Sequence, residues 1–142
     1  VRTSGKKMDK TLDSSCLGLV WPSEVMDASD TRMMNTVNKI IKINGKNGGI
    51  HRYPNDKYDG RIKMGELVLG GAGAWPILNF WLSIYFSKLG ERKKALKYFE
   101  WVINKVDEKI PEQIKRGRPS SVVPLAWSHA MFVIACKFLG FI

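Results

Sequence analysis

Residues 67–86 carry no formal charge, and this run constrains the fold of the chain more than any other feature of its sequence. A run of that length is enough to cross a bilayer as one helix. Three glycines and then Pro76 interrupt its first half, and proline is favoured in the first turn of a helix. The pattern therefore predicts a helix of about 15 residues that begins near Ala74, which is short for a membrane span and typical of a helix packed in a protein core.

The rest of the chain alternates between amphipathic segments and loops rich in glycine and proline. Apolar residues at spacings of three and four predict a first helix capped by Asp30 or Thr31 and stopped by the run 44–49. Gly90 ends the uncharged helix, and further helices are predicted at about 91–106 and 123–139. No segment alternates as a strand does, so we expect an all-α fold of antiparallel helical hairpins. Its two long loops, residues 50–73 and 108–122, would gather at one end.

Charge and cysteine usage narrow the classes of function. The net charge is +10, but the basic residues are spread along the chain and form no compact nucleic-acid-binding motif. Solvated basic faces are the favoured interpretation, with nucleic-acid binding as a minor alternative. Cys16 and Cys136 match no disulfide framework, and His51 and His129 lack metal-ligand spacing. We expect free thiols, a cytoplasmic location, no metal and no cofactor.

The two long loops contain residues that suit a polyhydroxylated ligand. Sugar rings stack on aromatic side chains, and their hydroxyl groups form charge-assisted hydrogen bonds. Each candidate also has a simpler explanation: a carboxylate in a first helical turn, a surface ion pair between Arg52 and Asp56, or a core tryptophan. The candidates are Arg52, Tyr53 and Asp56 in the first loop, Glu112 in the second, and Trp75 and Trp127 where helices leave the loops.

The order of these motifs resembles the glucoamylase family of glycoside hydrolases, which includes some trehalases. The motifs that carry the resemblance are TLDSSCLGLVWP, HRYPNDKYDG, GAWPILNFWL, IPEQI and PLAWSHA, and together they cover nearly the whole chain. The resemblance implies part of an (α/α)6 barrel with its active site in the loops at one end. It further implies that residues 1–142 are the C-terminal portion of a single catalytic domain, with the upstream hairpins absent.

The resemblance also implies roles for individual residues. Glu112 matches the general base of an inverting mechanism, and Ser121 is expected to hydrogen-bond to its carboxylate. Arg52 and Asp56 match the loop that binds the sugar, and Trp127 matches an aromatic residue close to the base. Tyr53 and Trp75 are expected to contribute to the same sugar-binding surface. Inverting hydrolysis needs a second carboxyl group as general acid, and the family's paired-acid motif is not found in this sequence. We therefore expect this chain alone to be inactive.

The expected function is hydrolysis of terminal α-glucosidic bonds in starch-type oligosaccharides, as part of a longer enzyme. Trehalose hydrolysis on the same scaffold is the nearest alternative. A non-catalytic carbohydrate-binding or interaction module is the alternative from another class. The expected partner is an α-glucan oligosaccharide or other α-glucoside, with no nucleic acid and no membrane. Loss of the upstream hairpins would expose apolar surface, so association through the open side of the barrel is expected.

Overall fold

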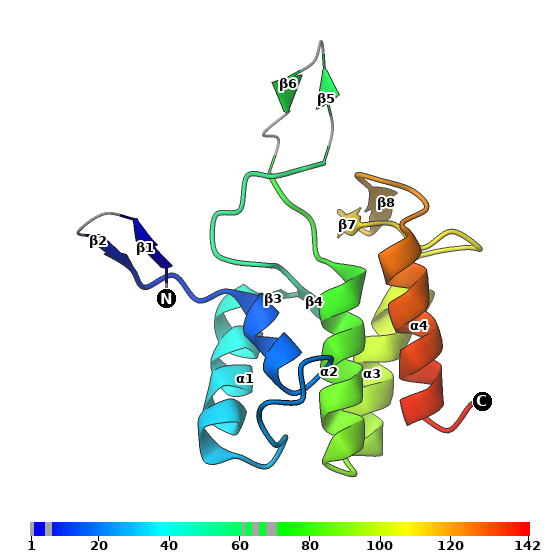
Figure 1. The fold of residues 1–142 in the computed structure, drawn as a ribbon. Helices are drawn as coiled ribbons and strands as arrows, with labels where there is room; N and C mark the ends of the chain where they lie inside the picture. Colours follow the sequence, from blue (N-terminus) through cyan, green and yellow to red (C-terminus); the bar gives the residue numbers. More distant parts are fainter. Residues whose placement is uncertain (1, 5–6, 61, 64–65, 68–70) are drawn as a thin grey trace.

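The computed structural model describes residues 2–4, 7–60, 62–63, 66–67 and 71–142. The body of the molecule consists of helices that lie side by side (Figure 1). They are the 3-10 helix η1 (Ser14–Leu19) and the α-helices α1 (Thr31–Asn44), α2 (Pro76–Lys88), α3 (Arg92–Ile103) and α4 (Ala126–Phe138). The predicted all-α architecture is confirmed, with each helix close to its predicted position.

Short antiparallel hairpins precede the helices or join them. Their strands are β1 (Arg2–Ser4), β2 (Lys7–Asp9), β3 (Gly45–Lys46), β4 (Gly49–Ile50), β5 (Ile62–Lys63), β6 (Glu66–Leu67), β7 (Gln113–Lys115) and β8 (Arg118–Ser120). Strands of two or three residues are too short to show alternation. The turns Asn47–Gly48 and Arg116–Gly117, with positive φ at both residues, close two of these hairpins.

The helix ends follow from local chemistry. The Asp30 carboxylate accepts a hydrogen bond from the backbone N–H of Arg32 and caps α1. Pro76 occupies the first turn of α2, where its missing N–H is no loss. Gly90, with φ of 72°, ends the connection after α2 and lets α3 return antiparallel to it. The last helix begins at Ala126 rather than near 123, because Pro124 disfavours helical geometry in the residue before it.

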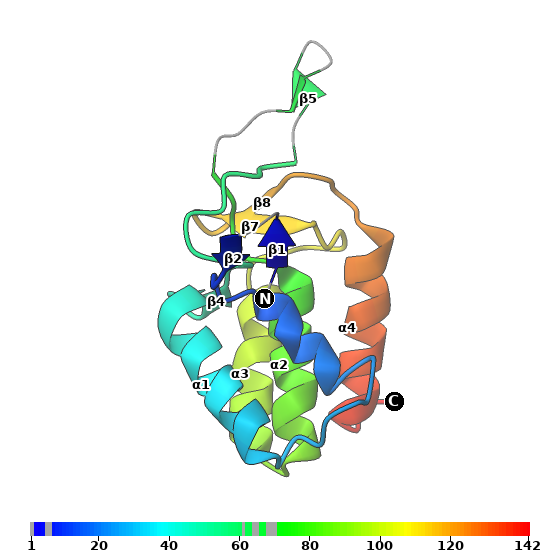
Figure 2. The same cartoon turned by 60° about the vertical axis from the view of Figure 1, so that its left-hand side comes forward.

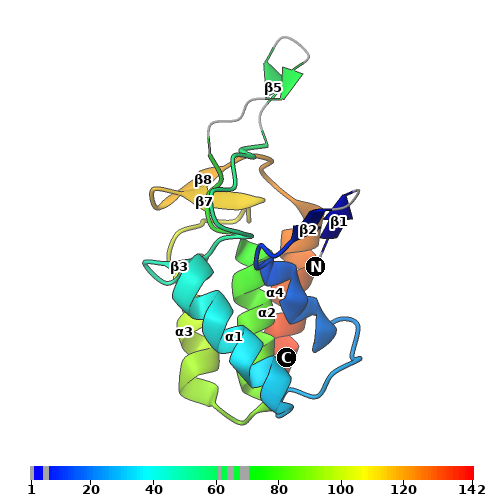
Figure 3. The ribbon, with the colours of Figure 1, turned by 90° about the vertical axis from the view of Figure 1, so that its left-hand side faces the viewer.

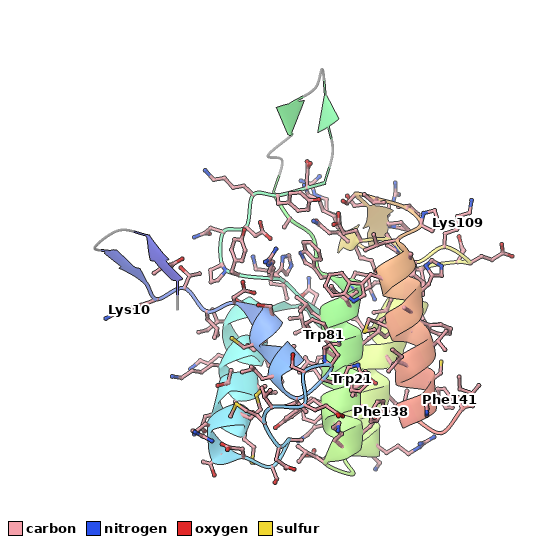
Figure 4. The ribbon with its side chains drawn as sticks, in the orientation of Figure 1. Lys10, Trp21, Trp81, Lys109, Phe138 and Phe141 are labelled. Atoms are coloured by element: carbon pink, nitrogen blue, oxygen red, sulfur yellow. The ribbon has the colours of Figure 1, made fainter. Side chains whose placement is uncertain are left out.

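Helix α2 lies at the centre of the core. Its residues 76–86 are all buried, and it contacts both α3 and α4. Phe80 packs against Phe99 of α3 and Phe132 of α4, with ring centroids 5.7 and 6.1 Å apart. Trp81 lies on α2, as Figure 4 shows, and its ring meets that of Trp127 of α4 edge-on. The uncharged run identified in the sequence is therefore the most enclosed helix of the described residues, and none of their helices is long and apolar enough to cross a membrane.

The loops converge at one end of this helical body. Figures 1, 2 and 3 show the starts of α2 and α4, the end of α1 and the β7–β8 hairpin at the same end. The opposite end holds the short α2–α3 connection and the start of α1. The expected gathering of the loops is therefore observed, and the candidate residues lie among them.

Candidate active site

Glu112 lies in a segment that backbone hydrogen bonds hold on both sides. The N–H of Glu112 donates to the carbonyl of Val122 at 2.8 Å, and Ser128 Oγ donates to the carbonyl of Pro111 at 2.8 Å. Ile114 and Ala74 exchange two backbone hydrogen bonds, of 2.8 and 2.9 Å. The segment is thereby fixed to the starts of both α2 and α4, so the carboxylate of Glu112 is presented by a rigid support.

Gln113 ties the two long loops together. Its side chain is fully buried, its Oε1 accepts a hydrogen bond from the N–H of Gly73 at 2.7 Å, and its Nε2 donates to the carbonyl of Tyr58 at 3.3 Å. Gly73 and Tyr58 both belong to the first loop, so this buried amide of the second loop bonds to the first loop at two points, and leaving either group unpaired would cost free energy. The residue next to Glu112 therefore holds the first loop in place beside it.

Two hydroxyl groups contact the Glu112 carboxylate. Ser121 Oγ donates to Oε2, as the resemblance implied. Tyr58 Oη lies 3.3 and 3.4 Å from the two carboxylate oxygens. Burial, and then the negative charge of Glu112, raise the pKa of the Tyr58 phenol above its ordinary value of 10.0. Tyr58 is therefore protonated at neutral pH and acts as a hydrogen-bond donor to Glu112.

Gly60 provides the space for this contact. A Cβ atom on Gly60 would overlap Ser121 Oγ and lie 2.7 Å from Oε2 of Glu112. The φ of Gly60 is +73°, in the region that residues with a side chain rarely adopt. Only glycine meets both requirements at this position.

A small cavity lies beside this group, and most of its lining residues are apolar. Its volume is about 110 Å³, and it is lined by Ser15, Arg52, Trp75, Ile77, Leu78, Trp81 and Trp127. The ring of Tyr58 stacks on that of Trp75, with centroids 6.0 Å apart and an interplanar angle of 22°. One stacked ring pair therefore connects the Glu112 carboxylate to the cavity wall.

Arg52 is positioned by a buried polar network at the end of α1. Asn44 Nδ2 donates to the carbonyl of Arg52 and to Ser14 Oγ, and the N–H of Ser14 also donates to that carbonyl. The guanidinium lies 5.7 Å from the ring centroid of Tyr53. Its ion pair is with Asp13, at 3.6 Å, whereas the sequence suggested Asp56 as the partner in a simple surface pair.

Asp56 shapes the first loop. Its Oδ1 accepts a hydrogen bond from the N–H of Tyr58 at 3.0 Å. Its Oδ2 is buried without a hydrogen-bond partner among the described residues, and so is Nε1 of Trp75. A buried polar atom without a partner is costly, and it is expected where a ligand completes the bonding.

Comparisons with known proteins place this chain in a family, although no protein-family model matches it. An uncharacterized glycosyl hydrolase of Methanocaldococcus jannaschii is 38% identical over 144 residues, covering 89% of this chain and 22% of that protein. Isomaltose glucohydrolase of Kribbella flavida is 26% identical over 144 residues, covering 91% of this chain and 34% of that protein.

Solved structures agree in fold. A glycosidase structure superposes with a TM-score of 0.75 at 26% identity and covers 92% of this chain and 36% of that one. A bacterial glucoamylase complexed with acarbose gives a TM-score of 0.67 at 26% identity, covering 91% of this chain and 20% of that one. The chain belongs to the glucoamylase-type glycoside hydrolases. Its helices form part of their (α/α)6 barrel, and the chain spans between about a fifth and a third of the length of the curated relatives it matches.

For this glucoamylase relative, the structure places five of the predicted site residues in two neighbouring groups. Glu112 and Ser121 are in direct contact. Arg52, Trp75 and Trp127 line the cavity, and Trp75 is both buried and part of the cavity wall. Tyr53 and Asp56 do not line the cavity. Tyr53 contacts Arg52, which lines it, and Asp56 accepts a hydrogen bond from Tyr58, whose ring stacks on Trp75 of the cavity wall.

Sequence reasoning missed Tyr58, Gly60 and Gln113. All three lie inside the motifs HRYPNDKYDG and IPEQI, so the motifs themselves were the signal that could have found them. In the part of the chain that the structure describes, no group of three or more His, Cys, Asp or Glu residues is arranged to hold a metal. Both cysteines have free thiols.

His129 lies on α4 and contacts the segment that precedes Glu112. It is half-buried, and its Nε2 accepts a hydrogen bond from the N–H of Ile110 at 3.3 Å. Its Nδ1 lies 3.0 Å from the carbonyl of Leu125. The position was hard to predict because Ile110 is 19 residues away in sequence. His129 therefore supports the segment that carries Glu112.

Proposed function

We propose that this chain supplies the general base and part of the sugar-binding surface of an inverting hydrolase of terminal α-glucosidic bonds. The observation that carries the proposal is the Glu112 carboxylate, held by Tyr58 and Ser121 and connected by one stacked ring pair to a cavity lined by aromatic residues. The name of the Methanocaldococcus jannaschii relative, a glycosyl hydrolase, agrees with this chemistry.

In the proposed mechanism, Glu112 accepts a proton from the water that attacks the anomeric carbon. An ionised carboxylate offers about four lone-pair sites, so two hydroxyl donors leave room for that water. Tyr58 and Ser121 orient the carboxylate, and the buried Gln113 prevents the loop beneath it from shifting. These contacts keep the base in position before substrate arrives. A catalytic group that is already positioned accelerates the reaction because no entropy is lost in orienting it.

The sugar-binding surface would use both stacking and hydrogen bonding. Trp127 is half-exposed beside the cavity and offers a face to the ring of the sugar. The unpaired Trp75 Nε1 is a donor for a hydroxyl group, and the unpaired Asp56 Oδ2 is an acceptor. Arg52, with Tyr53 beside it, adds a charged donor at the same cavity.

The general acid is proposed to come from another part of a longer enzyme, of whose catalytic domain residues 1–142 would be the C-terminal portion. A single carboxylate does not both protonate the leaving oxygen and activate water on the opposite face of the sugar. The chain spans only 22% and 34% of the two curated relatives, which leaves most of a catalytic domain to supply that acid. On this proposal the 142 residues alone are inactive. The two free thiols agree with a cytoplasmic location for the enzyme.

Replacing the base tests the proposal. In the longer enzyme, Glu112→Gln should lower kcat by about 10²- to 10⁴-fold while sugar affinity changes little, since removal of a general base affects the transition state more than the ground state. Glu108→Gln is a matched control, because Glu108 is an exposed carboxylate of the same loop. Near-normal hydrolysis by Glu112→Gln, or an equal loss in both variants, would reject Glu112 as the base.

Product analysis tests the mechanism and the substrate. Proton NMR of the first product should show β-glucose released from an α-linked substrate, because the reaction inverts the anomeric centre. Maltose is expected to be the better substrate than trehalose or isomaltose if starch-type oligosaccharides are the natural ones. Isomaltose is included because one relative is named for it. Initial release of α-glucose would contradict the inverting mechanism.

A non-catalytic carbohydrate-binding module is the second candidate, and the cavity favours it because its lining residues all lie within these 142 residues. This alternative predicts that the chain alone binds glucose or maltose saturably, and that the longer protein hydrolyses neither. Calorimetric titration of the chain, together with the hydrolysis assay, distinguishes the two functions.

A further inference from the structure

The start of η1 holds the backbone of Arg52 in place. The N–H of Ser14 donates to the carbonyl of Arg52 at 2.7 Å, and Ser14 Oγ donates to the carbonyl of His51, also at 2.7 Å. Asn44 Nδ2 donates to Ser14 Oγ at 2.8 Å and to the carbonyl of Arg52 at 3.2 Å. Ser14 and Asn44 are both buried. A segment from a distant part of the chain therefore fixes the position from which the Arg52 side chain extends.

The side chain of Arg52 needs further contacts to hold it at the cavity. An arginine side chain has many rotamers, so a fixed backbone does not by itself fix the guanidinium. The side chain is 40% exposed, and packing alone leaves it partly free. Its Nε lies 3.6 Å from Oδ2 of Asp13, and its guanidinium lies 5.7 Å from the ring centroid of Tyr53. These two contacts orient the guanidinium.

The carboxylate of Asp13 is itself held by a separate contact. Its Oδ1 accepts a hydrogen bond from the N–H of Ser15 at 2.9 Å and caps η1, while its Oδ2 faces Arg52. The side chain is only 23% exposed, so solvent screens its charge less than that of a fully exposed carboxylate. Asp13 therefore offers Arg52 an anion whose position does not depend on the ion pair.

This arrangement leaves the cavity side of the guanidinium available to a ligand. Ser15 and Arg52 both line the cavity, and η1 lies alongside α1 and α2 (Figure 1). Asp13 contacts Nε, the inner nitrogen of the guanidinium, and the two outer nitrogens carry further N–H donors. Those outer donors can bind a hydroxyl group while Nε stays at Asp13. The ion pair and a ligand in the cavity are therefore compatible.

We propose that Asp13 is a positioning residue, which holds the guanidinium of Arg52 at the cavity and thereby increases the affinity for the sugar. The assignment of the ligand as a sugar rests on the function proposed above. The simpler explanation is that Asp13 only caps η1, since many exposed ion pairs contribute little. A test therefore has to separate the cap from the charge.

Asp13→Asn makes this separation, and the chain offers a matched control. Asparagine caps a helix as well as aspartate does, so the variant keeps the cap of η1 and loses the anion beside Arg52. Asp30 also caps a helix, through the N–H of Arg32, and also forms an ion pair with an arginine, at 2.7 Å from Arg32 Nη2. It lies at the start of α1, at the end of the helical body opposite the site. Asp30→Asn therefore removes the same charge and the same kind of ion pair away from the cavity.

NMR of the ¹⁵N-labelled chain without ligand tests the positioning itself. In Asp13→Asn, the Nε–H signal of Arg52 should shift, and its order parameter should fall, as it does in flexible groups. In Asp30→Asn the Arg52 signal should stay unchanged. Melting curves of both variants check that the proteins compared are folded. An Arg52 signal that does not change in Asp13→Asn would overturn the proposal, because the ion pair would then not orient the guanidinium.

Calorimetric titration of the longer enzyme with glucose tests the effect on affinity. Asp13→Asn should weaken binding by about two- to fivefold, the size of effect expected from a partly exposed ion pair. Asp30→Asn should leave the affinity unchanged. Arg52→Gln should weaken binding more, because it removes the charged hydrogen-bond donor itself. In the Arg52→Gln background, Asp13→Asn should have no further effect, since the two residues act through one contact.

The double variant shows whether Asp13 acts through Arg52. If Asp13→Asn weakens glucose binding equally with and without the guanidinium, Asp13 does not act by positioning Arg52, and the proposal is wrong. An equal loss in Asp30→Asn would attribute the effect to net charge and would also reject it. If the unchanged enzyme binds no glucose, the proposed function and the effect on sugar affinity fail together. The NMR result still decides in that case whether Asp13 positions Arg52.

Discussion

Helices α2 and α4 have the same length and a similar apolar character but very different surroundings. Each has 13 residues, and each begins at the site end after a residue that forms no side-chain cap. Helix α2 buries the eleven consecutive residues 76–86, whereas α4 buries only Ser128, Met131, Ala135 and Cys136. Composition alone therefore does not reveal whether a helix is enclosed by its own chain.

One face of α4 carries apolar side chains that are exposed in this chain. Trp127 and Val133 are about half-exposed, and Figure 1 shows α4 at one side of the helical body, away from α1. Apolar surface of this kind usually marks an interface. We propose that the remaining helices of the barrel cover it in the longer enzyme, and that the 142-residue chain alone associates through it.

The largest expected contrast between the two helices is in the cost of removing an apolar side chain. Phe80→Ala in α2 should lower the free energy of unfolding by about 3–5 kcal/mol, because Phe80 is fully buried and its loss leaves a cavity. Val133→Ala in α4 should cost no more than about 0.5 kcal/mol in the isolated chain at concentrations low enough for it to be a monomer. Urea denaturation of both variants measures the difference.

The value for Val133 depends on what covers α4. If Val133→Ala costs as much as Phe80→Ala in the isolated chain, α4 is already covered by a second copy. Sedimentation at several concentrations would then show a dimer. A larger cost in the longer enzyme than in the isolated chain would support coverage by the remaining helices of the barrel.

The sequence predicts the enclosed helix better than the open one. Glycines before Pro76, and Gly90 after the helix, bracket α2, so its start and end were predicted to within two residues. The residues that surround a helix come from distant parts of a chain, so no local pattern in α4 indicates its exposed side. The hairpins were missed for a related reason, because pairs of two-residue strands depend on their turns rather than on alternation.

The candidate site shows the same division between local and distant information. Glu112 and Ser121 were both predicted as site residues, and their contact spans only nine residues. The ion pair of Arg52 with Asp13 spans 39 residues and was not predicted. Tyr58 contacts Glu112 across 54 residues and was also missed, since loop closure rather than local spacing brings the two together.

The second contrast, of intermediate size, is in the cost of removing a polar side chain that hydrogen-bonds to a loop near the site. Each of the two helices has one such side chain. Asn79 of α2 accepts a hydrogen bond from the N–H of Ile50 and donates to the carbonyls of Gly48 and Tyr98. Asn79→Ala should cost about 2–3 kcal/mol, because it leaves a buried N–H unpaired. Ser128→Ala in α4 should cost about 1 kcal/mol, because it removes one bond to the carbonyl of Pro111.

Denaturation of both variants, with hydrolysis assays of the longer enzyme, tests this order. Ser128→Ala could instead prove more costly than Asn79→Ala. The segment before Glu112 would then depend more on its single bond to α4 than the loop at Ile50 depends on Asn79. That result would contradict the view that α2 is the principal support of the site.

The smallest expected effect is a change of stability with pH, caused by His51 in the loop that α2 holds. His51 follows Ile50, and burial, and then the positive charge of Lys46, lower the pKa of its imidazole below the ordinary 6.5. The unfolded chain therefore takes up a proton at His51 more readily than the folded chain. Stability should be fully present above about pH 6.5 and decrease as the pH falls from that value through the lower folded pKa.

His51→Gln should reduce this loss of stability, because the replacement side chain does not titrate. Urea midpoints of the variant and the unchanged chain, measured between pH 8 and pH 5, would show it as a smaller decrease in the variant. An identical decrease in both proteins would mean that other groups cause the acid sensitivity. A smaller decrease of stability in the variant would show that the loop held by α2 excludes water from His51. The face of α4 differs in this respect, because its Trp127 and Val133 are half-exposed.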